Sequence, residues 1–269
     1  LYRTNSDYLI NSDWDLRKMN NRIDVNIEHK YAHGNGKLNL RLQSSALGSY
    51  YDYNTLSLST RNNNKLEKLE ITTRVFFQIG TGTNWAEESK LGLAGANNEE
   101  MMDSKFTRSE GIISSEYTDY SYTTNSFHSG GGLNLRGYTG YLAPEFNEDG
   151  TIASFNYNGT SGASFNTEID FTAYLPYSIR KKNISSYLFA DAGIITSENL
   201  TKENYKESFS DFRADAGIGF TYTFRNFGPL ETVNPLVIRF DMPLFLNRAP
   251  ATDDNFVQMR WLIGINRAF

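Results

Sequence analysis

Residues 22–31 read RIDVNIEHKY, a stretch in which apolar and polar side chains alternate. Ile23, Val25 and Ile27 fall on one side of an extended chain, and charged or amide side chains fall on the other. Successive side chains of a β-strand point to opposite faces of the sheet. The alternation therefore predicts a strand with one apolar face and one polar face.

The same alternation recurs along the whole chain. In the first half it appears at 37–43 (KLNLRLQ), 55–60 (TLSLST) and 68–79. In the second half, alternating segments lie at 165–175, 187–195, 212–224, 236–242 and 256–269. Further strands are expected at 8–14 and within 117–135, and a short helix at 99–105. The chain is therefore predicted to be all-β.

Two kinds of connection join the expected strands. AHGNG at 32–36 and RNNNK at 61–65 are predicted to be tight hairpin turns. By contrast, the connections at 80–130 and 196–211 are long and polar. Short turns that alternate with long loops are typical of outer-membrane barrels.

The composition narrows the classes of function. The 269 residues include no cysteine and carry a net charge of -5. This excludes disulfides and thiol chemistry, and it argues against nucleic acid as a partner. The three histidines, His29, His33 and His128, form no recognisable metal motif. His128 could serve a serine hydrolase only beside a G-x-S-x-G nucleophile elbow, and the chain has no such motif. We expect no catalytic residues, no metal and no cofactor.

A polar face on every strand is compatible with two architectures. In a soluble β-sandwich the polar faces meet water, whereas in a membrane barrel they line the lumen and the apolar faces meet lipid. The strands are about ten residues long, enough to cross a bilayer at a tilt. Aromatic residues gather near the strand ends, as an interfacial girdle requires. This favours an antiparallel transmembrane β-barrel of about 10–12 strands, or the C-terminal part of a 16-stranded one. A soluble β-sandwich binding module is the alternative.

Three segments carry a family resemblance. They are GGGLNLRGYTGY at 130–141, YLFADAG at 187–193, and the tail 212–269 with RADAGIGF, FGPL, PLVIRFDMPL and a terminal Phe. In this order they resemble the BamA/TpsB (bacterial surface antigen) superfamily of outer-membrane proteins. The resemblance covers about half of the chain. It implies a single barrel domain over 1–269, in which a long loop at 80–160 carries the RGY motif and folds into the lumen.

The resemblance also implies a pairing between the loop and the barrel wall. Arg136, Gly137 and Tyr138 would form the loop motif, and its arginine would meet an aspartate within an F-x-D-x-G motif made by Phe189, Asp191 and Gly193. The alternation independently places Asp191 on the polar face. An arginine inside the lumen would need a charge partner because a buried, unpaired charge is costly. The alternative is that Arg136 is a solvated loop residue.

The C-terminal segment resembles the signal by which the barrel-assembly machinery reads outer-membrane proteins. Trp261, Ile263, Ile265 and Phe269 would form its apolar face. An ordinary last strand of a barrel would show the same pattern.

The implied role is non-enzymatic insertion, translocation or surface anchoring of polypeptide in a bacterial outer membrane. The expected partners are membrane lipid and lipopolysaccharide, a polypeptide substrate or fused passenger, and the barrel-assembly machinery. The loop sequence at 91–111 is similar to barrels fused behind M1-like zinc metallopeptidases of Bacteroidota. The chain holds no H-E-x-x-H motif, so any such peptidase, like any other upstream domain, would precede Leu1.

Overall fold

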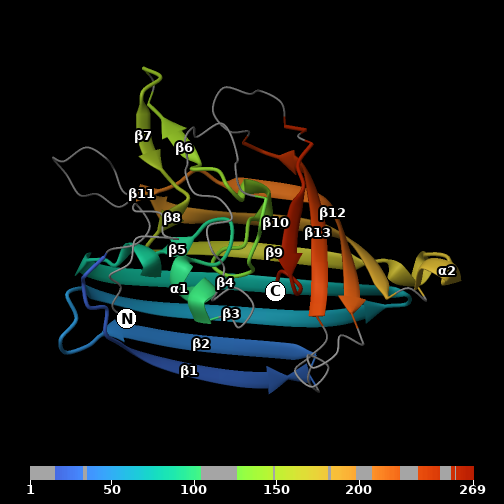
Figure 1. Cartoon of the computed structure of the whole chain (residues 1–269), viewed down its shortest axis with the longest axis horizontal. Helices are drawn as coiled ribbons and strands as arrows, with labels where there is room; N and C mark the ends of the chain where they lie inside the picture. Colours follow the sequence, from blue (N-terminus) through green and yellow to red (C-terminus); the bar gives the residue numbers. More distant parts are fainter. Residues whose placement is uncertain are drawn as a thin grey trace.

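One antiparallel sheet forms the body of the protein (Figure 1). The computed structural model describes residues 16–32, 35–103, 126–147, 149–180, 183–197, 208–224, 236–248, 256–257 and 259–269. The sheet has ten strands in the order β1-β2-β3-β4-β9-β10-β12-β13-β14, with β11 paired to β10. Their bounds are β1 Arg22–Tyr31, β2 Gly36–Ser45, β3 Asp52–Leu66, β4 Leu69–Asn84, β9 Gly162–Asp170, β10 Ile184–Ser197, β11 Ser208–Phe209, β12 Arg213–Phe224, β13 Leu236–Leu246 and β14 Leu262–Ile265. The prediction of an all-β, antiparallel protein is confirmed.

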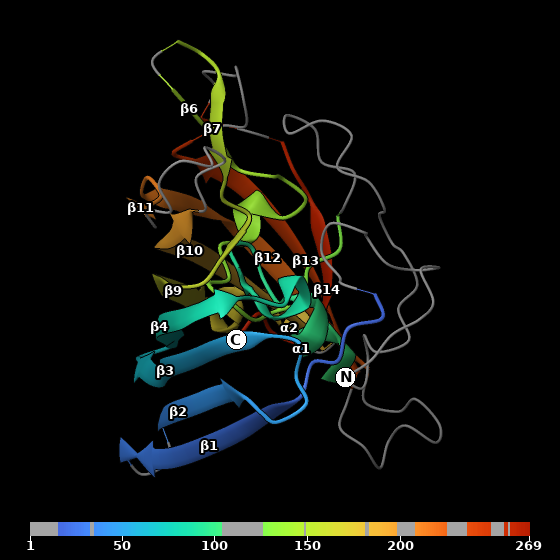
Figure 2. The same ribbon diagram turned by 90° about the vertical axis from the view of Figure 1, so that its left-hand side faces the viewer.

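The sheet curves around the long connection between β4 and β9 (Figure 2). Among the described residues, β1 and β14 are the two ends of the sheet and do not pair with each other. The short elements of this connection are η2 Glu87–Ser89, β5 Leu91–Gly92, α1 Asn98–Asp103, η3 Arg136–Tyr138, β6 Pro144–Phe146, β7 Ile152–Phe155 and β8 Asn158–Gly159. Two further short helices, η4 Thr172–Tyr174 and α2 Tyr177–Arg180, join β9 to β10. We call the described residues between β4 and β9 (85–103, 126–147 and 149–161) the inner loop.

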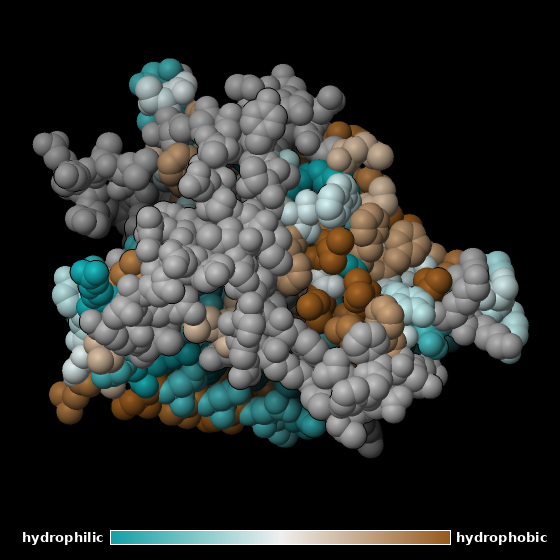
Figure 3. Space-filling view, viewed as in Figure 1, coloured by the Kyte–Doolittle hydropathy of each residue, from teal (hydrophilic) through white to brown (hydrophobic). Residues whose placement is uncertain are grey.

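Burial in the sheet is the reverse of that in a soluble protein. On β4, the apolar side chain of Val75 is 49% exposed on the outer face, whereas its neighbour Arg74 is only 8% exposed on the inner face. Figure 3 shows hydrophobic and hydrophilic residues side by side along the lowest strands. Other exposed apolar residues of the wall are Ile23, Val25, Ile27, Phe77, Ile79, Phe165, Leu188, Ile238 and Phe240. A β-sandwich would pack these faces together, so the sandwich alternative does not describe this sheet.

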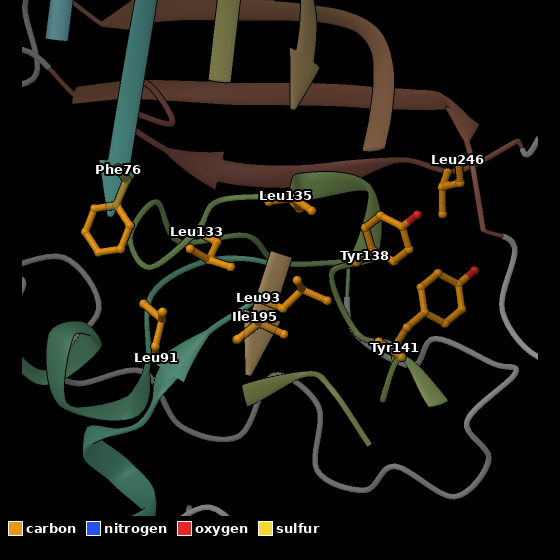
Figure 4. Packing of buried hydrophobic residues seen from close by; sticks show 10 residues of the cluster. Phe76, Leu91, Leu93, Leu133, Leu135, Tyr138, Tyr141, Ile195 and Leu246 are labelled. Atoms are coloured by element: carbon orange, nitrogen blue, oxygen red, sulfur yellow. The ribbon is translucent and has the colours of Figure 1, made fainter. Parts of the chain in front are cut away.

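The hydrophobic core lies between the inner loop and the wall (Figure 4). Leu91, Leu93, Leu133 and Leu135 of the inner loop are all buried there. They pack with residues of the wall strands and of the loop tip, namely Phe76, Ile195, Leu246, Tyr138 and Tyr141. The inner loop thus supplies the apolar partners that a second sheet would supply in a sandwich.

Two local predictions differ from the structure. The turn predicted at 61–65 is wrong, because β3 continues to Leu66 and pairs with β4 down to Leu66↔Leu69. The chain turns at Glu67, which has a positive φ of 55°. The asparagines at 62–64 resemble a turn in the sequence, but cross-strand pairing holds them in the ladder.

The remaining local predictions are either confirmed or fall partly outside the described residues. The turn predicted at 32–36 and the helix predicted at 99–105 are confirmed as the β1–β2 connection and α1. The strand predicted at 8–14, residues 117–125 of the segment 117–135, and His33 lie outside the described residues. In 126–135, which the structure describes, there is no strand beyond an isolated bridge at Phe127. Within the described part of the chain, no helix is both long and apolar enough to cross a bilayer.

Candidate functional site: the inner loop and its strand wall

The RGY motif forms the short helix η3, and all three of its residues are buried. Backbone bonds from Tyr138 N to Leu135 O (3.0 Å) and from Thr139 N to Arg136 O (3.2 Å) close the turn. The Arg136 side chain is fully buried, with 0% exposure. The interpretation of Arg136 as a solvated loop residue is therefore wrong.

The guanidinium of Arg136 meets carboxylates from three strands. Its Nε lies 2.7 Å from Asp191 Oδ2 on β10, and its Nη1 lies 2.8 Å from Glu168 Oε1 on β9. Asp241 on β13 is further away, with 3.8 Å between Nη1 and Oδ2. A second bond joins Arg136 Nη2 to Asp191 Oδ1 at 3.3 Å. The structure thus brings Arg136 and Asp191 together in a two-atom contact, the geometry that gives arginine–carboxylate pairs their direction.

The other motif residues shape the space around this ion pair. The Phe189 ring centre lies 4.3 Å from Arg136 Cζ, within the range of a cation–π contact. A Cβ on Gly137 would lie 2.5 Å from Cβ and 2.7 Å from Cγ of the Asp215 side chain. A Cβ on Gly193 would lie 2.7 Å from the carbonyl oxygen of Ala163 and 3.1 Å from Leu135 Cδ1. Both glycines therefore let the inner loop and the strand wall come closer together than any side chain at these positions would allow.

Tyr138 attaches the inner loop to the start of β12 and to the residue that follows the end of β13. Its hydroxyl donates to Asn247 Oδ1 at 2.9 Å, and the same oxygen accepts from Ala214 N at 2.7 Å. Burial raises the pKa of the Tyr138 hydroxyl above its ordinary value, so the hydroxyl remains a donor at neutral pH.

Further bonds extend the contact along the wall. Asn166 Nδ2 donates to the backbone oxygens of Leu133 (3.2 Å) and Asn134 (3.0 Å) and to Asp191 Oδ1 (3.1 Å). Arg74 Nη2 donates to Gly132 O at 2.7 Å. Sequence reasoning placed these residues on the inner face by their alternation but could not assign them to the loop.

The network also reaches β13 and the end of the chain. Arg239 pairs with Asp241 (Nη1 to Oδ2, 2.5 Å), and the Tyr187 hydroxyl donates to the same carboxylate. Arg267 binds Asp170 (Nη2 to Oδ2, 2.8 Å) and lies 3.4 Å from Glu168 Oε2. The carboxylates that meet Arg136 are therefore themselves held by neighbours.

A second attachment holds the other end of the inner loop. Asn20 Nδ2 donates to Ser89 Oγ at 3.0 Å, and the hydroxyl of Tyr53 donates to Asn20 Oδ1 at 3.1 Å. Arg22 of β1 pairs with Glu99 of α1. The reciprocal bonds of Asn97 and Glu100 form a capping box at the start of this helix. The inner loop thus contacts both halves of the sheet.

The C-terminal residues depart from the predicted continuous apolar face. Trp261 and Ile263 are exposed on the outer face, and Trp261 stacks on Phe240. Strand β14 ends at Ile265, however, and Asn266 has a positive φ of 66°. Phe269 consequently turns inward, where its ring centre lies 5.7 Å from Arg136 Cζ. The expectation that Phe269 shares the outer face of Trp261 and Ile263 is wrong because the backbone at Asn266 breaks the alternation.

A metal ion would need several acid or histidine side chains close together. Among the described residues, no set of three or more His, Cys, Asp or Glu side chains has a suitable arrangement. His29 lies on β1 opposite Leu38, and His128 lies inside the inner loop.

Comparison with known proteins gives a likeness of structure but none of sequence family. A scan against protein-family models found no match. A search of curated proteins also found no match. Among solved structures, the chain is similar to the crystal structure of BamA from Haemophilus ducreyi lacking POTRA domains 1–3, with a TM-score of 0.42 and 14% sequence identity. The match covers 91% of this chain and 41% of that one, so the chain spans about two fifths of its length. Membership of the BamA/TpsB superfamily stays a prediction.

Proposed function

We propose that the chain is an outer-membrane β-barrel of the BamA/TpsB type, which acts non-enzymatically in the insertion, translocation or surface anchoring of polypeptide. The observation that carries this proposal is the reversed burial of the sheet. Apolar side chains cover its outer face, and charged side chains are buried on its inner face. Soluble monomers rarely expose contiguous apolar surfaces of this kind, whereas transmembrane barrels present them to lipid.

Aromatic residues at both ends of the strands support a membrane position. Tyr50 lies in the β2–β3 connection, and Tyr174 and Tyr177 lie at the opposite ends of the strands, between β9 and β10. All three are exposed. Lys18 lies over the Tyr50 ring and Lys68 over the Tyr174 ring. Amphipathic rings with nearby cations suit the headgroup level of a bilayer.

The inner loop supports a role in shaping the lumen. It is attached to β9, β10 and β13 through Arg136 and to β1 through the Arg22–Glu99 pair. A segment held at both sides of the sheet narrows the lumen and fixes the relative positions of strands that lie far apart in the sheet. We propose that this arrangement sets the passage or binding surface that a polypeptide meets.

Labelling of two adjacent positions on β1 tests the membrane position. Ile27 lies on the outer face and Glu28 on the inner face. The chain has no cysteine, so Ile27→Cys and Glu28→Cys each introduce a single thiol. In outer membranes, a membrane-impermeant maleimide should label Glu28→Cys, and only a lipid-soluble maleimide should label Ile27→Cys. Equal labelling of both thiols by the impermeant reagent would contradict the barrel.

Depletion of the parent protein from its native membrane separates the three roles. Loss of other assembled barrels would indicate insertion, and loss of a secreted polypeptide would indicate translocation. If neither changes and a folded domain attached to the barrel can be released by proteolysis, anchoring is the role, and the upstream metallopeptidase becomes the domain to look for. If none of the three occurs, the proposed function is wrong even though the membrane position stands.

A further inference from the structure

A short piece of the inner loop lies along the last strand of the sheet. His128 N donates to Ile263 O at 2.8 Å, and Ile263 N donates to Ser126 O at 2.7 Å. These bonds form a parallel bridge between Phe127 and Ile263, on the side of β14 away from β13. We call residues 126–129 the edge cap. The cap uses the backbone groups of Ile263 that any further strand would need in order to pair there.

His128 holds the edge cap through both of its ring nitrogens. Its Nδ1 lies 2.5 Å from Arg239 Nη2, and its Nε2 lies 2.9 Å from the carbonyl oxygen of Ala94. A guanidinium can only donate, so Nδ1 must accept, and the ring proton must be on Nε2. Arg239 Nη2 also donates to the backbone oxygen of His128 at 3.1 Å. The geometry therefore requires a neutral His128.

The surroundings of His128 oppose a second ring proton. The side chain is buried, and the charged groups around it are Arg239 and Asp241 from β13 and Arg136 from η3. The other neighbours, from the Ala94–Gly95 segment and from Gly264 of β14, are backbone groups. Burial, followed by the charges of Arg239 and Arg136, holds the pKa of His128 well below its ordinary value of 6.5.

We propose that the edge cap is a pH-sensitive closure of the β14 edge, which opens when His128 takes up a second ring proton. That proton would sit on Nδ1, directly against the Arg239 guanidinium, and would remove the bond that holds the cap. Once open, the cap exposes His128 to solvent, where its pKa returns to about 6.5. The open form then binds the proton more tightly than the closed form. Closure is therefore strongest at neutral pH and weakens about tenfold per pH unit below about 6.5. This inference does not depend on the proposed polypeptide role.

Amide hydrogen exchange tests the proposal on the full chain refolded in detergent micelles. The amides of His128 and Ile263 report closure, and those of β12 report the barrel itself. In the wild type, protection of the two cap amides, corrected for intrinsic exchange, should fall about tenfold per pH unit between pH 6.5 and 5, while β12 stays protected. Constant protection of the cap amides over this range would overturn the proposal.

Two variants assign the effect to His128. His128→Gln keeps an acceptor for Arg239 and a donor for Ala94 but cannot titrate, so its cap should stay closed at every pH tested. His128→Lys places an ammonium there, which cannot accept from Arg239, so its cap should be open at pH 7. If His128→Gln loses protection at low pH as the wild type does, another group is responsible and the proposal fails. If the β12 amides also lose protection in His128→Lys, that variant has disturbed the barrel itself. The comparison of the wild type with His128→Gln then decides whether His128 controls the cap.

Discussion

Phe189 lies beneath the guanidinium of Arg136, and Asp191, two residues later on the same strand, binds the edge of the same guanidinium. Gly193 follows two residues further on and leaves room for Leu135 of the inner loop. Because alternate residues of a strand share a face, F-x-D-x-G places a ring, a carboxylate and a gap in one row. Phe189 and Asp191 of this row contact Arg136, and Gly193 makes room for Leu135, so the row fits the inner loop that lies against this face of the sheet.

Removing the Arg136 side chain should destabilise the barrel strongly. Arg136→Ala leaves Asp191 buried without its cation and Glu168 with only the more distant Arg267, and breaking a buried pair typically costs about 3–5 kcal/mol. The stability of Arg136→Lys should fall between that of Arg136→Ala and that of the wild type, because an ammonium cannot make the two-atom contact of a guanidinium with a carboxylate. Urea titration in detergent, followed by heat-modifiable gel migration, measures the loss.

The matched control for Arg136 is Arg41, which pairs with Asp24 at a more exposed site. Arg41→Ala should cost less than about 1 kcal/mol. Equal losses for Arg136→Ala and Arg41→Ala would show that the buried pair does not hold the barrel.

A methyl group at Gly137 should push the loop tip away from β12. The added Cβ would collide with Cβ and Cγ of the Asp215 side chain, so Gly137→Ala should disturb the ion pair of the neighbouring Arg136. The effects of Gly137→Ala and Arg136→Ala on the free energy of unfolding should then be non-additive by about 0.5–3 kcal/mol.

Gly150 provides the comparison for Gly137, because a Cβ there would meet nothing within 4 Å. Gly150→Ala adds only backbone strain from its positive φ, and its effect should add to that of Arg136→Ala. A Gly137→Ala variant that is also additive would refute the coupling.

A lysine on the outer face of the wall should be far more costly than one on the inner face. Val25 and Asn26 are neighbours on β1 and are both exposed, but they point to opposite faces. In a bilayer, Val25→Lys should cost about 2–4 kcal/mol if its position is near the midplane. Asn26→Lys should change the free energy of unfolding by less than about 0.5 kcal/mol. Refolding into lipid vesicles measures both, and indistinguishable variants would argue that the outer face does not meet lipid.

Loss of the Phe269 ring should weaken the loop attachment in the purified protein. Its cation–π contact with Arg136 is expected to contribute about 0.5–2 kcal/mol. Phe269→Ala should therefore have little further effect in the Arg136→Ala background, whereas Trp261→Ala should have the same effect in both backgrounds. Should Phe269→Ala reduce assembly in cells but leave the purified barrel unchanged, its role would be that of an assembly signal alone.

The strand faces were predictable because the alternation of side chains is a local property of the sequence. It placed Val75 outside and Arg74 inside without any tertiary information. The pairing of Arg136 with Asp191 could be anticipated only through a family resemblance, and the roles of Glu168 and Asp241 could not, since their contact with Arg136 depends on how far the sheet curves. The turn at Glu67 and the inward path of Phe269 depend on single backbone angles that side-chain patterns do not report.

The position of Arg136 in the chain bears on the order in which the protein is built. Glu168, Asp191 and Asp241 all follow it in the sequence, so a growing chain presents the arginine before any of its partners. A buried guanidinium cannot pass through a finished wall without losing its hydration and its pairs together. The inner loop must therefore reach the inner face before β9, β10 and β13 complete the wall around it.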